Sequence, residues 1–575
     1  MKLKKILPIL EWLPLYTASR FKGDFVAGIT VGIILIPQGI AYALIAGLPP
    51  IYGLYAALVP QLVFAIFGSS RQVAIGPVAM DSLIVAAGVS TLALTGSQSY
   101  IEIALLLALM VGAIQFLMGV FRLGFVVNFL SKPVITGFTS AVALIIGFNQ
   151  FRNLLGADFE QSDQIQDVVL EIWTNISEVN LYTAIIGTSA AIIIIIFRKI
   201  NKKIPNALIV VILGILVMKY LGKNFVNVAI VKDIPAGLPS FGMLEIDIDQ
   251  IKELVPIALT LVMVGFLETI SIGKTLEAKQ DEYRIRANQE LISLGLSNMV
   301  GSLFKSYPIA SSFSRSAINQ ESGGTTGVSA FISVIMVVIT LLYLTPVFYF
   351  LPKAILAAII IVAVFGLIKV KEAKKLWKTN NLDFWMLLVT FIATLTLGIE
   401  YGIIAGVGLS VIVLIFRTSR PYIAVLGKVP SSNFYKNCER FKDVIIDDDV
   451  LVIRFDAQIF YGNTNYFRDY LDDLAEKKGK ALKLIVIDAE SINRIDSTGL
   501  EMLKDQIKFY QKKGVLIYFA GVKGPVRDVM FRGEMLDIID INHFFMRVYG
   551  AVNFYKTGNR KHQKKYANYI HHTYK

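Results

Sequence analysis

The sequence has few of the residues on which most enzyme and metal sites depend. Its 575 residues include one cysteine, Cys438, so an intrachain disulfide is excluded. The only histidines are His543, His562, His571 and His572. We find no phosphate-binding glycine loop, no cluster of metal ligands and no nucleophile–histidine–acid pattern. We therefore expect neither an enzyme nor a metal or cofactor site.

Charged residues are also scarce, at 17%, whereas 55% of the residues are hydrophobic and the mean hydropathy is +0.61. Apolar runs of nearly twenty residues recur between residues 25 and 417, for example at 104–121 and 181–197. Each run is long enough to cross a bilayer core of about 30 Å. This repetition predicts a polytopic helical membrane protein of about fourteen spans.

The charge distribution predicts the orientation of the chain. Residues 1–22 lack the long apolar stretch and the cleavage site of a signal peptide, so we expect a cytoplasmic segment at the membrane surface. Basic loops at 198–203 and 369–378 alternate with the acidic segment 150–180. The positive-inside rule places the basic loops and both termini in the cytoplasm. The net charge of +13 therefore gives no reason to expect nucleic-acid binding.

The composition changes after the last apolar run, which predicts a transmembrane domain at 23–420 and a different domain behind it. Strand-like runs lie at 450–455, 483–490 and 515–521. Charged helical patterns separate them, so we expect a small cytoplasmic α/β domain at 437–552, after a linker at 421–436. The tail at 553–575 has six Lys or Arg and no acid, so it is either disordered or in contact with anionic lipid.

Two polar breaks interrupt the apolar pattern. The first lies in 69–89, where a Gly-Pro pair at 76–77 opens a helix at membrane depth. The second lies in 307–320, where Pro308 is followed by four serines and Arg315. The breaks fall in about the third and tenth spans, and matching breaks are typical of transporters built from inverted repeats.

Two halves of seven spans would have to be inverted with respect to each other, because each half has an odd number of spans. We expect these repeats at about 23–222 and 250–418. A helix that starts at mid-membrane directs its free N–H groups and its positive dipole end at the space between the halves. Two such ends that face each other predict an anion site.

Side chains near the second break add to this prediction. Hydroxyl groups come from Ser311, Ser312 and Ser314, and Arg315 adds a guanidinium that is costly unless it is paired or faces a cavity. In the alternative interpretation the serines allow close helix packing, and Arg315 makes a structural pair or reaches the interface.

Polar residues in two other spans belong to the same candidate site. Glu268 is the one charged residue in 254–273. Desolvation favours its neutral form, whereas the nearby Arg315 favours its ionised form. A carboxyl group balanced between these two effects is suited to take up and release a proton. A permanent ion pair with Arg315 is the structural alternative. Gln38 and Tyr42 share one helix face of the first span and can line a polar cavity.

Five stretches of the sequence carry a family pattern. They are IPQGIAYALIAGLPPIYGLY (36–55), SSRQVAIGPVA (69–79), FLETISIGK (266–274), NQELISLGLSNMVGSLF (288–304) and SSFSRSAINQ (311–320). Together they resemble the sulfate permease (SulP) family of anion transporters, whose mammalian relatives include prestin. The resemblance covers nearly the whole chain, and RIDSTGLEML (494–503) resembles STAS domains.

The resemblance implies a core and a gate subdomain made from two inverted seven-span repeats. An anion would sit between the starts of spans three and ten and would cross by an elevator movement of the core. The implied anion contacts are Gln38, Tyr42, Val78, Ala79, Ser314 and Arg315, and Glu268 matches the acidic position of span eight. Family members are commonly homodimers.

The STAS motif raises the question of regulation. In similar bacterial antagonists the serine after the aspartate is phosphorylated, and here that serine is Ser497. Asp496 or Ser497 would in any case cap the helix that starts near Thr498. Capping is the simpler interpretation, but a phosphate at a helix N-terminus is tolerated, so regulation and a cytoplasmic STAS partner stay open.

The choice of anion rests on the resemblance, because family members carry sulfate, bicarbonate, chloride, iodide, oxalate or dicarboxylates. SSFSRSAIN (311–319) looks most like the sulfate-carrying members. Sodium-coupled bicarbonate members pair a span-eight Asp with a Thr one turn later, whereas here Ile272 follows Glu268. We expect proton-coupled sulfate uptake. A bicarbonate or dicarboxylate transporter, coupled to sodium or protons, and an uncoupled channel or exchanger are the alternatives.

Conductance in planar bilayers would favour the channel, and anion-dependent binding of a cytoplasmic partner without anion flux would favour a sensor. The mostly apolar spans do not obviously provide the continuous polar path that a channel needs.

The composition also bears on the location of the protein. The single cysteine, the richness in Ile and Lys and the compact STAS domain fit a bacterial inner-membrane protein.

Overall fold

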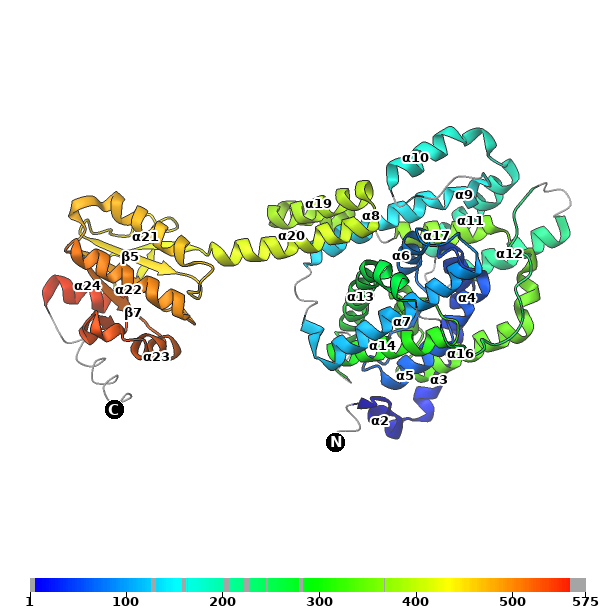
Figure 1. Cartoon of the computed structure of the whole chain (residues 1–575), viewed down its shortest axis with the longest axis horizontal. Helices are drawn as coiled ribbons and strands as arrows, with labels where there is room; N and C mark the ends of the chain where they lie inside the picture. Colours follow the sequence, from blue (N-terminus) through cyan, green and yellow to red (C-terminus); the bar gives the residue numbers. More distant parts are fainter. Residues whose placement is uncertain are drawn as a thin grey trace. The chain divides into compact units, whose positions relative to one another are not determined.

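The computed structural model describes residues 6–125, 131–157, 162, 164–200, 206–221, 227–244, 247–278, 283–366 and 368–558. The chain forms two compact units, Met1–Val411 and Ile412–Lys575, and each is described by itself (Figure 1). The basic tail lies outside the described residues from 559 onward.

The first unit is helical. Its first half contains α2 (Ile9–Trp12), α3 (Ala18–Ile45), α4 (Pro50–Tyr55), α5 (Val59–Phe67), α6 (Ala79–Val89), α7 (Gln98–Val120), α8 (Lys132–Asn149), α9 (Phe151–Leu155), α10 (Ile165–Thr174), α11 (Leu181–Ile200) and α12 (Asn206–Leu221). Its second half contains α13 (Ile248–Glu277), α14 (Ala287–Leu303), α15 (Phe313–Glu321), α16 (Val328–Ile339), α17 (Lys353–Phe365), α18 (Val370–Thr379), α19 (Asn381–Leu397) and the start of α20 (Ile399–Ser419).

Many of these helices can cross a bilayer. Within the described residues, nine helical segments are long and apolar enough to span a membrane. Three shorter apolar helices, α6, α12 and α19, have lengths between ten and seventeen residues. The expectation of many spans is therefore confirmed, while the count of about fourteen stays a prediction.

Two groups of helices pack within this unit. In one group α7 contacts α13 and α14, and α3 contacts α4, α15 and α16. In the other group α8 contacts α17 and α19, and α11 contacts α12 and α17. The groups meet where α3 contacts α12 and α17, and where α6 contacts α8. The short helix α6 therefore lies at the boundary between the groups.

Glycines allow the closest helix contacts of the first group. A Cβ atom added to Gly112 of α7 would lie 2.7 Å from the carbonyl oxygen of Gly295 in α14, and the reverse distance is also 2.7 Å. Gly39 of α3 and Gly53 of α4 approach each other in the same way. Small residues at such crossings let backbones pack directly, and this close packing is one source of helix association in lipid.

The second unit is an α/β domain. Its strands are β3 (Ile423–Lys428), β4 (Tyr435–Asn437), β5 (Val450–Phe455), β6 (Leu484–Asp488), β7 (Leu516–Ala520) and β8 (Phe544–Phe545). They form one sheet in the order β4-β3-β5-β6-β7-β8, in which β5 to β8 are parallel and β3 is antiparallel to both neighbours. Its helices are α21 (Thr464–Lys478), α22 (Ser497–Lys512), α23 (Gly524–Arg532) and α24 (Val548–Thr557).

The start of this domain corrects one expectation. Residues 421–436, expected as a linker, contain β3, which pairs with β5 through Ile423 and Phe455. The composition does not mark β3, because its apolar run follows almost directly on the apolar helix α20. Two apolar cores cover the sheet, one with α21 and α22 and the other with α24, so the strand–helix alternation was interpreted correctly.

Candidate functional site

The two polar breaks meet in space. Strand β1 (Ile75–Gly76) pairs antiparallel with β2 (Ala310–Ser311), although residues 77–309 lie between them in the chain. The Ser312 N–H donates to the Ala74 carbonyl oxygen at 2.9 Å, and the Ala74 N–H donates to Ser316 Oγ at 2.9 Å. Helices α6 and α15 begin just after these strands. The pairing therefore brings two helix N-termini together at one place.

The first helix starts slightly later than the sequence suggested. The Gly-Pro pair at 76–77 was expected to open it, whereas Val78 is the N-cap and α6 begins at Ala79. Gly76 belongs to β1 and has a φ of +141°, a conformation that favours glycine. A Cβ atom on Gly76 would lie 3.5 Å from Arg315 Nη2. The absence of a side chain at this position therefore keeps the space beside the guanidinium open.

Arg315 is the central polar group of the site. Its side chain is completely buried, and Nη1 donates to Gln38 Oε1 at 3.3 Å. Nε and Nη2 have no hydrogen-bond partner among the described residues. Tyr42, Glu268 and Tyr307 interact with the guanidinium electrostatically. A buried cation with two unused donors is costly, and an anion with several oxygens would satisfy both.

Two of the predicted contact residues, Gln38 and Tyr42, interact with this guanidinium. Gln38 and Tyr42 of α3 are buried, and so are Val78 and Ala79 at the start of α6. Ser314 is exposed and hydrogen-bonds Ser312 Oγ at 3.3 Å.

The serines near the start of α15 make different hydrogen bonds. Ser312 caps α15 by accepting from the Arg315 N–H at 3.4 Å. Ser311 is buried, and its hydroxyl is 2.6 Å from Thr269 Oγ1. Ser311 therefore ties β2 to α13 and has less capacity left for an anion than the sequence suggested.

Glu268 lies on α13 near the guanidinium but is not paired with it. The residue is half-buried, and its Oε2 is buried without a hydrogen-bond partner in the described part of the chain. The ion pairs of the described residues do not include one between Glu268 and Arg315, although the two groups interact electrostatically. A permanent ion pair, the structural alternative, is not what this conformation contains.

Sequence reasoning missed three polar residues at the site. Asp81 in the first turn of α6 is buried and interacts electrostatically with Glu268. Tyr307 is completely buried, with its hydroxyl 3.1 Å from Ser82 Oγ, and Thr269 contacts Ser311. The signal for Asp81 was available, because a carboxyl within an apolar helix indicates function in the same way as Glu268 does.

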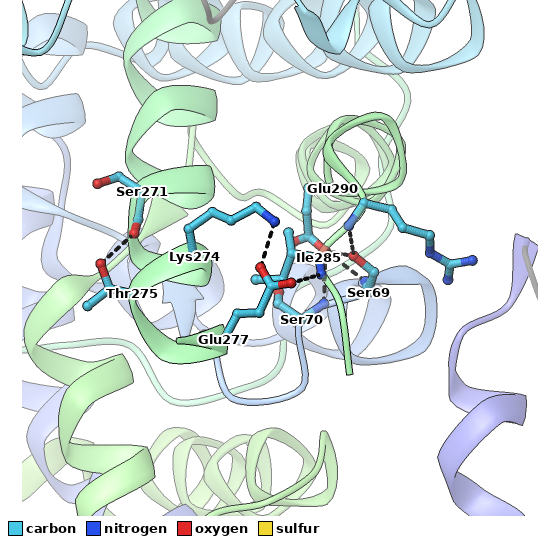
Figure 2. A network of polar contacts seen from close by, with 9 residues as sticks. Ser69, Ser70, Ser271, Lys274, Thr275, Glu277, Ile285 and Glu290 are labelled. Atoms are coloured by element: carbon cyan, nitrogen blue, oxygen red, sulfur yellow. Dashed lines mark hydrogen bonds and ion pairs between the residues drawn. The ribbon is translucent and has the colours of Figure 1, made fainter. Parts of the chain in front are cut away.

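A buried carboxylate holds the segment that leads into β1. Glu290 of α14 accepts from the backbone N–H groups of Ser69 and Ser70 at 2.7 and 2.9 Å, and from both hydroxyls at 2.6 and 2.8 Å (Figure 2). Lys274 and Glu277 at the end of α13 form an ion pair beside it at 2.6 Å. Four donors on one carboxylate fix this segment firmly, since losing one partner of a buried charged group is costly.

A second buried carboxylate holds the segment after α15. Asp24 of α3 accepts from the backbone N–H groups of Thr325 and Thr326 at 2.6 and 3.0 Å, and from the Tyr16 hydroxyl at 3.1 Å. Both half-helices are therefore anchored to longer helices, α6 through Glu290 and α15 through Asp24. Neither contact could be predicted from sequence patterns, because each joins residues far apart in the chain.

The STAS motif has the capping geometry. Asp496 accepts from the Gly499 N–H at 2.8 Å and from the Tyr461 N–H at 2.9 Å. Ser497 is the first residue of α22, and its side chain is exposed. Within the described residues, no group of three His, Cys, Asp or Glu side chains could hold a metal ion.

These features define a class of protein. A chain with a polytopic helical unit, in which two short helices begin at paired strands, and with a separate α/β domain has the architecture of a membrane transporter and not of an enzyme. The chain belongs to the sulfate permease family, which matches residues 21–390, and a STAS domain matches residues 442–551. The predicted family and fold class are thereby confirmed.

Curated relatives span almost the same length. The chain is 36% identical to Sulfate transporter 4.1, chloroplastic, of Arabidopsis thaliana, over 95% of this chain and 82% of the relative. It is 33% identical to High affinity sulfate transporter 2 of Stylosanthes hamata, over 96% of this chain and 87% of the relative.

Solved structures agree with this assignment. The murine Solute Carrier 26 family member A9 anion transporter, in its inward-facing state, has a TM-score of 0.88 and 26% identity, over 96% of this chain and 94% of that chain. The transmembrane domain of a cyanobacterium bicarbonate transporter, BicA, shares the fold with a TM-score of 0.61 and 21% identity, over 68% of this chain and 99% of that chain.

Proposed function

We propose that this protein is a secondary active transporter that takes up sulfate together with protons. The observation that carries the proposal is the buried guanidinium of Arg315, which lies at the meeting point of two helix N-termini with Nε and Nη2 unsatisfied. Family membership supports anion transport, and the printed names of the curated relatives favour sulfate.

Sulfate suits the donors that converge here. A tetrahedral dianion has oxygens for the guanidinium, for the free N–H groups at the starts of α6 and α15, and for the Ser314 hydroxyl. Gln38 Oε1 accepts a hydrogen bond from Arg315 Nη1 at 3.3 Å and so orients the guanidinium. The buried Tyr42, also on α3, lines the proposed site. Bicarbonate or a dicarboxylate has fewer or more widely spaced oxygens, and each is an alternative that competition would reveal.

Coupling to protons is assigned to Glu268. Its half-buried position and unsatisfied Oε2 suit a carboxyl that alternates between protonated and ionised forms. A sodium site would need several hard oxygen ligands, and Ile272 supplies none one turn along α13. We propose that the group of helices around α13 and α14 carries the site past the group around α17 and α19, as an elevator.

The setting of the protein is part of the proposal. We place it in the inner membrane of a bacterium, with both termini and the STAS domain in the cytoplasm, because the basic loops at 198–203 and 369–378 follow the positive-inside rule. We propose a transmembrane domain at 23–420 and a STAS domain that begins with β3 at Ile423 and ends near residue 552. We further propose a homodimer and a cytoplasmic partner for the STAS domain, with Ser497 as a regulatory phosphorylation site.

Uptake into proteoliposomes tests the proposal. Radiolabelled sulfate should accumulate when the outside is more acidic and should only equilibrate when the pH is matched. Glu268→Gln should lower the accumulation reached at a given pH gradient but retain exchange of sulfate for sulfate, because anion binding survives while this proton acceptor is lost. Lys252→Gln, at an exposed position of α13, is the matched control.

Three results would contradict the proposal. Uptake that ignores the pH gradient would exclude proton coupling. Preferred transport of bicarbonate, chloride or fumarate would correct the substrate. A steady conductance in planar bilayers would show a channel.

A further inference from the structure

A second carboxyl group lies beside Glu268. Asp81, in the first turn of α6, is almost fully buried, and its Oδ1 has no hydrogen-bond partner in the part of the chain that the structure describes. A Cβ atom built on Gly265 of α13 would lie 3.9 Å from Asp81 Oδ2. Gly265 and Glu268 are three residues apart and share one helix face, so Asp81 faces the side of α13 that carries Glu268.

The surroundings leave these two carboxyls with little positive charge. Helix α13 packs against α6, α7, α14, α15 and β2. From these elements the uncharged pair Gln115–Asn298 and the hydroxyl of Ser311 lie near α13. Among the described residues, Arg315 and Tyr42 interact electrostatically with Glu268, and Tyr307 interacts with Asp81.

Arg315 therefore interacts electrostatically with Glu268, which in turn interacts with Asp81, and bound sulfate adds a dianion to the same site. Several negative charges against a single cation in a desolvated site are very unfavourable. Protonation of both carboxyls when the anion arrives removes most of this repulsion. Linkage then requires that bound sulfate favours protonation and that protonation favours sulfate binding to the same degree.

We propose that Asp81 is a second proton acceptor of the transport cycle, so that two protons cross with each sulfate. One proton binds to the Asp81 carboxylate and one to the Glu268 carboxylate on the side where sulfate enters. Both leave on the other side together with the anion. The loaded site then carries the two charges of sulfate balanced by two protons, and the cycle moves no net charge. This inference rests on the proposed function.

The proton count can be measured in proteoliposomes whose membrane potential is held at zero with potassium and valinomycin. For a gradient of one pH unit, two coupled protons predict about 100-fold sulfate accumulation, and one coupled proton predicts about 10-fold. The wild-type protein should reach the higher ratio, and an imposed membrane potential should leave that ratio unchanged.

Asp81→Asn tests which group carries the second proton. We expect accumulation to fall to about 10-fold per pH unit. We also expect the variant to respond to membrane potential, because one negative charge then crosses in each cycle. Asp81→Ser should behave in the same way if Asp81→Asn does not fold. Asp249→Asn, at an exposed position near the start of α13, is the control that should keep the wild-type ratio.

The outcomes separate the two proposals. Sulfate accumulation by the wild-type protein that does not depend on the pH gradient overturns the proposed function. A wild-type protein that couples one proton overturns only the role of Asp81, and so does an Asp81→Asn variant with the wild-type ratio and no response to voltage.

Discussion

The guanidinium of Arg315 explains more of the site than any other side chain. Within a membrane-spanning unit a charge persists only where it faces a cavity, a partner or a ligand. Here Gln38 satisfies one nitrogen, and Glu268 interacts through space without forming an ion pair. Gln38 therefore orients the group, and the remaining donors are free for an anion.

Replacing Arg315 should weaken sulfate binding and leave the fold intact. Loss of its charged hydrogen bonds should raise the Kd for sulfate about 10- to 100-fold in Arg315→Gln, and Arg315→Lys should recover only part of this loss because an ammonium cannot bind in a bidentate way. Thermal stabilisation of the purified protein by added sulfate measures the effect. An Arg315→Gln variant that sulfate stabilises as well as wild type would show that the anion binds elsewhere.

Sequence reasoning pointed to single residues whose chemistry conflicts with their surroundings. Gln38, Tyr42, Glu268 and Arg315 were predicted because polar groups in apolar runs are costly, and the structure places the first three near Arg315, while their roles stay predictions. Asp81 obeys the same rule and was overlooked. Ser311 was assigned to the anion, but its hydroxyl contacts Thr269, a contact that only the folded chain reveals.

The short elements between the helices set the geometry of the site. Strands β1 and β2 have two residues each, yet their pairing aligns the starts of α6 and α15. The sequence indicated both breaks through proline and serine, but it could not indicate that the breaks pair, because no local pattern records a contact between strands that residues 77–309 separate. The anchoring of both breaks by Glu290 and Asp24 was unpredictable for the same reason.

Gly76 should be the most sensitive position of this strand pair. Gly76→Ala forces a side chain into a φ of +141° and places a methyl group 3.5 Å from Arg315 Nη2. We expect a loss of about 1–3 kcal/mol in stability together with weaker sulfate uptake. Thermal unfolding in detergent and uptake assays would measure both effects.

Gly408→Ala is the matched control, because its Cβ meets nothing within 4 Å and alanine favours a helix. Equal behaviour of the two variants would mean that β1 tolerates a side chain and does not set the site.

At the scale of the whole molecule, hydropathy and strand–helix alternation were sufficient for the fold class. Both signals are repeated many times along the chain, so single errors matter little. The boundary between the units was less certain, because β3 follows almost directly on α20 and has the same apolar character.

The most direct test of the account is to locate the bound anion. Selenate has the shape and charge of sulfate, and selenium gives an anomalous X-ray signal, so crystals of the protein grown with selenate would reveal its position. We predict one selenium peak between the starts of α6 and α15, with its oxygens within hydrogen-bond reach of Arg315 Nε and Nη2. A peak elsewhere in the transmembrane unit, with these donors still unoccupied, would contradict the site proposed here.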